Sequence, residues 1–472
     1  MKRQEEWQEI EELKRQIPVL MERAREAGLD FFDMRFELCP AEVLYTFGAY
    51  GMPNRFSHWS FGKAYYRLKT QYDYNLSRIY ELVINSDPCY AFLLDGNSLI
   101  QNKMVVAHVL AHSDFFKNNF RFAGTSRWML ESMAASARRI ESYEFRYGRQ
   151  AVERFLDAVL SIQEHVDPYA APGQEPLSSA VAVSGRARPT PYDDLWDLDG
   201  YLLCPQAGQN CRKDRAEERE GAAVSRKVPA SPQRDLLWFL IYYAPDLDDW
   251  QRDIIAILRE EMLYFRPQME TKIMNEGWAS YWHLRLLREA DLSQSEALEF
   301  ARLHALVTHP YAAGINPYLV GLRIFEDVEK RWGEAGREKI FEIRETETDV
   351  SFIRNYLTAE LVEELDLYLF RRVGLRWQVV EKEWEKVREG MLALLVNCGI
   401  PLITVEDGDY RRQGELYLKH HYEGIELDIP YAEKTLEHIY YIWGRPVHLE
   451  TVIDGRPHRL SCHGERTTRF TL

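Results

Sequence analysis

The chain has 472 residues, of which 46% are hydrophobic and 28% are charged, and its formal net charge is −15. This length predicts two or three domains with ample buried cores, and the negative charge argues against nucleic acid or an anionic membrane as the default partner. We expect a cytoplasmic protein with no membrane span, because no apolar run reaches about 18 residues and the charged N-terminus does not have the apolar core of a signal peptide.

Residues 1–167 are predicted to form the N-terminal helical part of a main domain. Apolar side chains recur at spacings of three and four from Trp7 to Leu20, which is typical of an amphipathic helix, and Gly28 closes it. The further elements expected here are a helix beginning near Tyr72, a strand over residues 91–94, a helix from Ile100 to Asn118, and two long helices over residues 126–166 with a break near Gly148.

Residues 168–232 differ in composition from the rest of the chain. They contain several prolines and a dense cluster of charges, with few periodic apolar residues, so we predict a loop-rich insertion or linker. The helical pattern then resumes. Residues 233–335 are predicted to be a second helical part of the main domain, and residues 336–398 to be a helical connection with helices over residues 359–370 and 377–395.

After Gly399 the apolar residues recur with a period of two, which indicates strands. The strand-like runs are residues 402–405, 416–418, 425–427 and 447–452, and a helix is expected over residues 432–443. Residues 399–472 are therefore predicted to form a C-terminal α+β domain with a short antiparallel sheet. The fold class expected for the whole chain is mostly α, with a large helical main domain and this smaller domain after it.

A segment rich in glycine and tryptophan, Met274–His283, sets a carboxylate and an imidazole seven residues apart near the start of a predicted helix. Seven residues are almost two helical turns, so Glu276 and His283 should project from one face. Together they could hold one ion or proton between this helix and a partner element. The alternative is structural: a carboxylate favoured at a helix N-terminus and a histidine packed among aromatic rings.

Two histidines, His108 and His112, lie one helical turn apart in an apolar run. Paired imidazoles at this spacing bind zinc in metalloproteases, but Val109 stands where the HExxH motif has its catalytic glutamate. The chain is therefore not a standard protease of that class. Asp114 and the polar residues after it are expected to supply hydrogen bonds to the ligands. The alternative is that both histidines are buried structural residues.

Other polar residues are secondary candidates. Glu261, on the predicted helix before the glycine and tryptophan segment, is a candidate general base, since a carboxylate in an apolar helical core has a raised pKa. Arg55 and His58 could bind a carboxylate or phosphate of a substrate, and Asn316, in a turn before a proline, is grouped with them. A di-iron bundle is disfavoured because its Glu-x-x-His spacing is absent from these helices.

Four stretches, taken in order along the chain, resemble the SpoVR family, named for stage V sporulation protein R. They are residues 51–59 (GMPNRFSHW), 108–119 (HVLAHSDFFKNN), 273–283 and 314–318 (GINPY). The resemblance spreads over most of the chain. It implies an association with formation of the spore cortex, and hence a peptide or peptidoglycan-precursor substrate. It also points to a PrkA-type serine kinase as the partner to consider, but it implies no settled chemistry.

Two functions stay open at this point. The first is a metal-dependent hydrolase or amide-bond enzyme, in which a divalent ion, expected to be zinc, is held by His108, His112 and His283. Glu276 would be a fourth ligand or the base, and both Glu276 and His283 must then lie within coordination distance of the two upstream histidines. The second is a non-catalytic sporulation or stress factor that acts through protein–protein interaction and whose buried polar cluster is structural.

Overall fold

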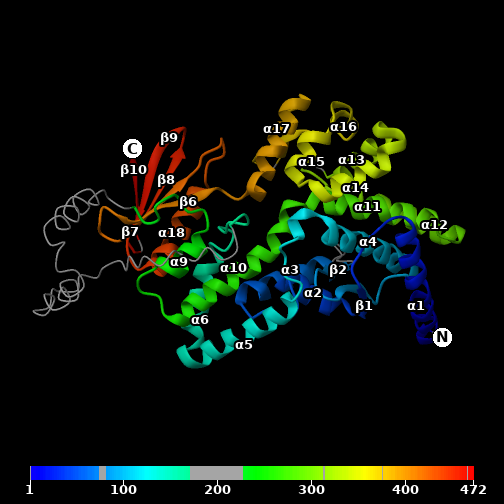
Figure 1. The fold of residues 1–472 in the computed structure, drawn as a ribbon, viewed down its shortest axis with the longest axis horizontal. Helices are drawn as coiled ribbons and strands as arrows, with labels where there is room; N and C mark the ends of the chain where they lie inside the picture. Colours follow the sequence, from blue (N-terminus) through cyan, green and yellow to red (C-terminus); the bar gives the residue numbers. More distant parts are fainter. Residues whose placement is uncertain (1, 74–80, 171–226, 312–313, 375, 465) are drawn as a thin grey trace, which may run out of the picture. The chain divides into compact units, whose positions relative to one another are not determined.

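The computed structural model describes residues 2–73, 81–170, 227–311, 314–374, 376–464 and 466–472 (Figure 1). The chain divides into two compact units, each of which joins two stretches of sequence. Residues 1–147 and 263–399 form the first unit, and residues 148–262 and 400–472 form the second. Most of the insertion predicted over residues 168–232 lies outside the described residues.

The first unit is built mainly from helices. Along the chain these are α1 (Lys2–Glu26), α2 (Ala41–Tyr50), α3 (Trp59–Asp73), α4 (Leu99–Asn118), α5 (Met129–Tyr147), α11 (Lys272–Arg288), α12 (Gln294–Val307), α13 (Pro317–Trp332), α14 (Gly336–Thr346), α15 (Asp349–Tyr356), α16 (Ala359–Glu364) and α17 (Trp384–Leu395). Helix α10 (Asp249–Glu270) contributes its last turns to this unit and its earlier turns to the second one.

Helices α4 and α11 lie in the core of the first unit. Helix α4 packs against α1, α11, α12 and α14 (Figure 1), and α11 also packs against α13. Nearly every side chain of α4 from Ile100 to Phe116 is buried, which explains why its sequence has no strong polar stripe. Its start is fixed by a capping box, in which Ser98 accepts from the Gln101 backbone and the Gln101 side chain caps Ser98 in return.

Two glycines let α11 approach α13 closely. A Cβ added to Gly277 would lie 2.4 Å from the backbone of Gly321, so a larger residue at this point would push the helices apart. The next residue, Trp278, is fully buried, and the rings of Phe325 and Phe341 meet it edge to face. This part of the glycine and tryptophan segment therefore packs the core beside Glu276.

The first unit also contains two small sheets. Strands β1 (Met34–Cys39), β2 (Glu81–Ile84) and β3 (Cys89–Leu94) form one in the order β1-β3-β2, with β1 parallel and β2 antiparallel to β3. Strands β4 (Leu369–Val373) and β5 (Arg376–Glu381) form a separate antiparallel hairpin.

The hairpin corrects part of the sequence prediction. The helices expected over residues 359–370 and 377–395 are too long, because α16 ends at Glu364 and α17 begins only at Trp384. Gly374, with a φ of 64°, makes the turn between the strands. Aromatic and β-branched residues such as Trp377 and Val379 favour a strand over a helix at this point.

The second unit combines helices with a five-stranded sheet. Its helices are α6 (Arg149–Leu160), α9 (Leu236–Tyr243), the first turns of α10, and α18 (Ile429–Trp443). Strands β6 (Ile403–Tyr410), β7 (Glu415–His420), β8 (Val447–Ile453), β9 (Arg456–Cys462) and β10 (Thr467–Thr471) lie in the order β10-β9-β8-β7-β6. Helix α18 packs on α6 and on strands β8 and β9.

The sequence predicted an antiparallel sheet, but the sheet in the structure is mixed. Strands β7 and β8 are parallel, with Leu416 paired to Val447, because α18 crosses over between them, and the other neighbouring strands are antiparallel. The strand expected over residues 425–427 is not formed. The predicted fold class is nevertheless confirmed: the chain is mostly helical, with a C-terminal sheet.

None of the helices that the structure describes combines the length and apolar character needed to cross a bilayer.

Candidate metal centre

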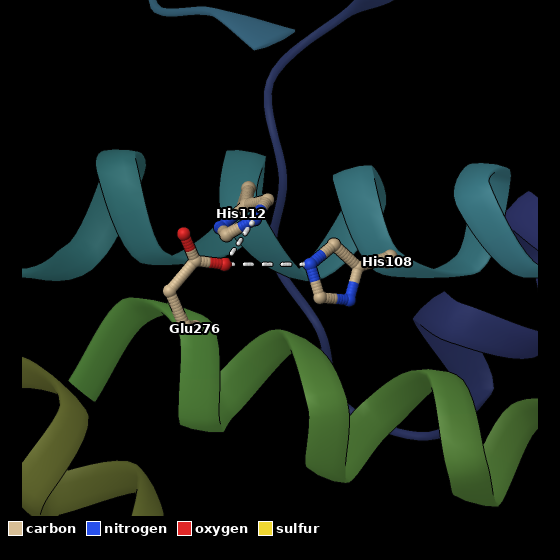
Figure 2. Close-up of side chains that lie close together, drawn as sticks. All are labelled: His108, His112 and Glu276. Atoms are coloured by element: carbon tan, nitrogen blue, oxygen red, sulfur yellow. Dashed lines mark ion pairs between the residues drawn. The ribbon is translucent and has the colours of Figure 1, made fainter. Parts of the chain in front are cut away.

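Helix α4 presents His108 and His112 toward α11 (Figure 2). Their rings meet edge to face with centroids 4.6 Å apart, and both side chains are almost fully buried. Phe116 stacks on His112, and Tyr318 of α13 stacks on His108, so packing fixes the orientation of both rings. The two imidazoles are therefore positioned before any ligand binds.

Glu276 reaches the histidines from the second turn of α11. The start of this helix is fixed by a residue far away in the sequence. The Asp349 carboxylate accepts hydrogen bonds from the backbone N–H groups of Ile273 and Met274, at 2.8 and 2.9 Å. A helix leaves its first N–H groups without internal partners, and an anion is favoured there. Asp349 thus sets the position of the turn that carries Glu276.

The Glu276 carboxylate lies between the two imidazoles. Its Oε2 is 3.6 Å from Nε2 of His108 and 3.5 Å from Nε2 of His112 (Figure 2). Both distances are too long for a good hydrogen bond, and the buried Glu276 Oε2 makes none with the described residues. Ligand atoms about 2.1 Å from a tetrahedral zinc ion are about 3.4 Å apart, which is close to the observed separations. All three ligand atoms lie within 4.8 Å of one another.

The electrostatics of the centre favour an ionised carboxylate. Burial opposes ionisation of Glu276, but His108 and His112 together outweigh it and hold the pKa of this carboxyl well below its usual range. The Glu276 side chain is 18% exposed, whereas His108 and His112 are 4% and 6% exposed, so Glu276 is the least buried of the three side chains. One anionic oxygen and two imidazole nitrogens are a donor set that suits zinc and related divalent ions.

A row of three histidines extends from the centre to α12. His108 Nδ1 is 2.9 Å from His283 Nδ1, and His283 Nε2 is 2.9 Å from His304 Nδ1. Burial, followed by repulsion from the neighbouring histidines, keeps the pKa of His283 well below its usual value, so this ring is neutral. His283 was predicted as a third nitrogen ligand, and the structure places it behind His108, outside the three convergent ligand atoms.

The second histidine has its own supporting residue. His112 Nδ1 is 2.8 Å from Oδ1 of Asn275. An amide oxygen only accepts hydrogen bonds, so His112 donates from Nδ1, which leaves Nε2 as the nitrogen that faces Glu276. Two adjacent residues of α11 thus serve the centre: Glu276 is a ligand, and Asn275 orients the ligand His112, as is common around metal-binding histidines.

Asp114 does not take the role expected from the sequence. Its buried carboxylate accepts hydrogen bonds from Trp278 Nε1 at 2.8 Å, from the Asp30 backbone at 2.7 Å and from Arg344 at 3.1 Å. These bonds join α4 to α11, to α14 and to the chain after α1. Burial raises the pKa of Asp114 to about 6, against the effect of Arg344 and of these bonds. Asp114 therefore stabilises the packing of the helices and does not orient the ligands.

The other predicted site residues are not among those that converge here. Glu261 is buried on α10, in the part that belongs to the second unit. Arg55 donates to a backbone carbonyl at the end of α2 and lies over the ring of Phe61, and His58 Nδ1 bonds to the Ser60 hydroxyl. Their roles as base and substrate-binding residues stay predictions.

Asn316 acts as the N-cap of α13. Its Oδ1 accepts from the backbone N–H groups of Tyr318 and Leu319. Its Nδ2 donates to the backbone carbonyls of Val307, at the end of α12, and of His309, in the loop that follows. The amide therefore uses its donors and acceptor within the chain. By fixing the first turn of α13, Asn316 also fixes Tyr318 against His108.

Two residues of the centre had no assigned role at the level of sequence, Asn275 and Asp349, and His304 was only a weak candidate for substrate binding. The position of Asn275, directly before Glu276, was the one available signal. His304 and Asp349 belong to separate helices and meet α11 only through tertiary packing, so no local spacing identifies them.

Comparison with known proteins agrees with the motif resemblance. Residues 5–400 match the model of the SpoVR-like protein family, and residues 401–454 match that of the SpoVR-like C-terminal domain. A curated relative, the uncharacterized protein YcgB of Escherichia coli (strain K12), is 28% identical over 463 residues, which cover 89% of this chain and 88% of the relative. No solved structure matches. The chain belongs to the SpoVR family of sporulation-related proteins.

Proposed function

We propose that this protein is a metal-dependent hydrolase of amide bonds, with a centre formed by His108, His112 and Glu276. The observation that carries the proposal is the buried Glu276 Oε2, which faces two imidazole nitrogens at 3.5 and 3.6 Å and makes no hydrogen bond with the described residues. A buried anionic oxygen is costly unless a cation or donor compensates it. A divalent ion at this point would satisfy all three side chains at once.

The donor set supports a catalytic ion over a structural one. Structural zinc usually has four protein ligands, whereas two histidines and a carboxylate leave one position for water or substrate. Zinc supplies a bound water with a pKa near 7 and polarises a carbonyl group. With Glu276 as a ligand and Val109 in the place of the usual catalytic glutamate, the general base is another group.

The sporulation association of the family supports the choice of substrate. Formation of the spore cortex involves peptide and peptidoglycan material, in which amide bonds join the building blocks. A protein that is cytoplasmic, as the sequence predicts, would meet a precursor of the wall and not the finished polymer. We therefore infer a peptide or a peptidoglycan precursor as the substrate class.

Metal content is the first test. Protein purified without chelator should contain about one equivalent of a divalent transition metal, with zinc expected, when measured by elemental analysis. The variants His108→Ala, His112→Ala and Glu276→Gln should each contain less than about a tenth of an equivalent. His309→Ala is the matched control, because His309 is an exposed histidine and its loss should leave the metal content unchanged. Wild-type protein without metal would overturn the proposal.

Hydrolysis is the second test and is independent of the first. Metal-loaded protein should convert a muramyl-peptide precursor into products whose masses sum to the precursor plus one water, and Glu276→Gln should not. A protein that binds metal but leaves peptides and precursors intact would keep the metal centre and reject the hydrolase.

A non-catalytic sporulation or stress factor is the alternative, and it predicts a different result for Glu276→Gln. If the polar cluster is only structural, this variant should support sporulation normally, or fail only in proportion to lost stability. The predicted PrkA-type serine kinase partner can be tested in the same comparison. Its binding, measured with purified proteins, should be the same for wild type and Glu276→Gln if the centre is catalytic and the partner surface lies elsewhere.

A further inference from the structure

The first unit contains a cavity of about 570 Å³, which is separate from the metal centre. It lies between the start of α13, the β4–β5 hairpin and α17. The interior is apolar: Val320, Met391 and Leu367 line it and are themselves buried. A volume of several hundred Å³ with mainly apolar walls is typical of a site for a small organic ligand.

The rim of this cavity is apolar and exposed. Trp377, Leu394 and Val379 line it and are 57%, 58% and 41% exposed. Large apolar side chains at the mouth of a cavity are unfavourable in water unless a ligand covers them. The cavity thus offers apolar surface both inside and at its entrance.

One residue gives the cavity a charge. Among the described residues that line the cavity, Asp366 is the one with a formal charge. The Tyr368 hydroxyl donates to Asp366 Oδ1 at 2.7 Å. Lys382 lies over the Tyr368 ring, 4.9 Å from its centroid, but does not line the cavity. The exposed Asp366 carboxylate keeps its second oxygen available to a ligand, so the entrance is suited to a positive group.

We propose that this cavity binds a small amphiphile with an aliphatic or aromatic body and a cationic head. The body packs on Val320 and Met391 in the interior, and the head pairs with Asp366 at the entrance. Charge complementarity selects this class: a carboxylate at the mouth repels fatty acids and other anionic amphiphiles. The inference does not depend on the metal centre, so metal content serves as a check of folding in every variant below.

The site is located with the neutral probe N-phenyl-1-naphthylamine, whose fluorescence rises on transfer to apolar surroundings, titrated into the full-length protein. Val379→Trp fills the entrance and should weaken probe binding about tenfold or more. Val380→Trp is the matched control, because Val380 is a neighbouring valine of similar exposure on the same strand and does not line the cavity. It should change binding less than about twofold. Absent binding, or equal effects of the two variants, would overturn the site.

The head group is identified by displacing the probe with dodecylamine or dodecanoate, each below its micellar concentration. Dodecylamine should displace it at concentrations about tenfold or more below those of dodecanoate. Asp366→Asn should abolish this preference, and asparagine tolerates the left-handed backbone at this position, where φ is 49°. Equal displacement by both compounds from the wild type, or an unchanged preference in Asp366→Asn, would overturn the cationic assignment.

Discussion

The Nδ1 atoms of His108 and His283 lie 2.9 Å apart in the interior of the first unit. One of these nitrogens must carry a proton and the other must accept it. Since Nε2 of His108 faces Glu276, the tautomer that directs a lone pair toward an ion there is the one in which His108 donates from Nδ1. His283 therefore acts as a positioning residue, which selects the tautomer of a ligand without touching the ion.

Replacing His283 separates this role from ligation. His283→Phe keeps the three ligand side chains but removes the acceptor of the His108 Nδ1–H, so we expect metal affinity to fall about 10- to 100-fold and not to disappear. His283→Asn should restore most of the affinity, because its Oδ1 occupies nearly the place of Nδ1. Competition with a fluorescent chelator measures both. If His283→Phe abolished binding as completely as His108→Ala, His283 would be a ligand.

The end of the histidine row predicts a pH dependence of stability. Burial, with Arg288 and His108 adding to it, lowers the pKa of His304 to about 4. In the unfolded chain this imidazole titrates near 6.5, so between these pH values the unfolded state binds a proton that the folded state does not. The stability contributed by neutral His304 is complete above about pH 6.5 and is lost as the pH falls through about 4.

His304→Asn tests this relation, since asparagine keeps an acceptor for His283 Nε2 but does not titrate. We expect the metal-free wild type to lose more stability than the variant as the pH falls from about 7 to about 4.5, with a constant difference above about pH 7. Urea unfolding at several pH values measures the free energies. A difference that stayed constant over the whole range would mean that folding does not perturb His304.

The contact between α11 and α13 predicts a stability effect at Gly277. Alanine there would place a Cβ 2.4 Å from the backbone of Gly321, so the helices must separate. We expect a loss of about 1–3 kcal/mol in the free energy of unfolding, and weaker metal binding because Glu276 is the preceding residue. In contrast, Gly62→Ala on α3 meets no atom within 4 Å and should stabilise the protein by up to about 1 kcal/mol. Equal effects of the two substitutions would contradict the close packing.

The parts of this fold that depend on residues close together in the sequence could be predicted, and those that depend on residues far apart in the sequence could not. Helix α4 and the α5–α6 break at Gly148 follow from periodicity and local chemistry, and the structure has them close to the predicted bounds. The β4–β5 hairpin was missed because a short apolar run fits a helix and a strand equally well. The parallel pairing of β7 and β8 also lies beyond local pattern, since alternation identifies a strand but not its neighbour.

In the metal centre, too, the features set by local helical geometry were predictable and those set by tertiary contacts were not. The i,i+4 spacing of His108 and His112, and the face shared by Glu276 and His283, are helical geometry and were visible in the sequence. Which nitrogen of each ring faces the carboxylate was not, because it depends on the hydrogen bonds of His112 to Asn275 and of His108 to His283. Those contacts depend on the packing of α4 against α11.

The carboxylate of Asp349 offers a test of how the centre is held from outside. It accepts from the N–H groups of Ile273 and Met274 at the start of α11, so Asp349→Ala removes two hydrogen bonds and leaves buried donors unsatisfied. We expect a loss of about 2–4 kcal/mol in the free energy of unfolding. Fraying of this first turn moves Glu276, so metal affinity should fall about tenfold even though all three ligands are present.

A second helix cap is the control for Asp349. Asp428 caps α18 through the Tyr431 N–H, and Asp428→Ala should cost about 1 kcal/mol with no change in metal affinity. Urea unfolding and chelator competition on the three proteins measure both quantities. If Asp349→Ala lowered stability but bound metal like the wild type, the cap would stabilise α11 without positioning Glu276. If Asp349→Ala weakened metal binding and Asp428→Ala did not, the position of Glu276 would depend on a residue 73 positions further along the chain. The reason would be that Asp349, at the start of α15, holds the start of α11.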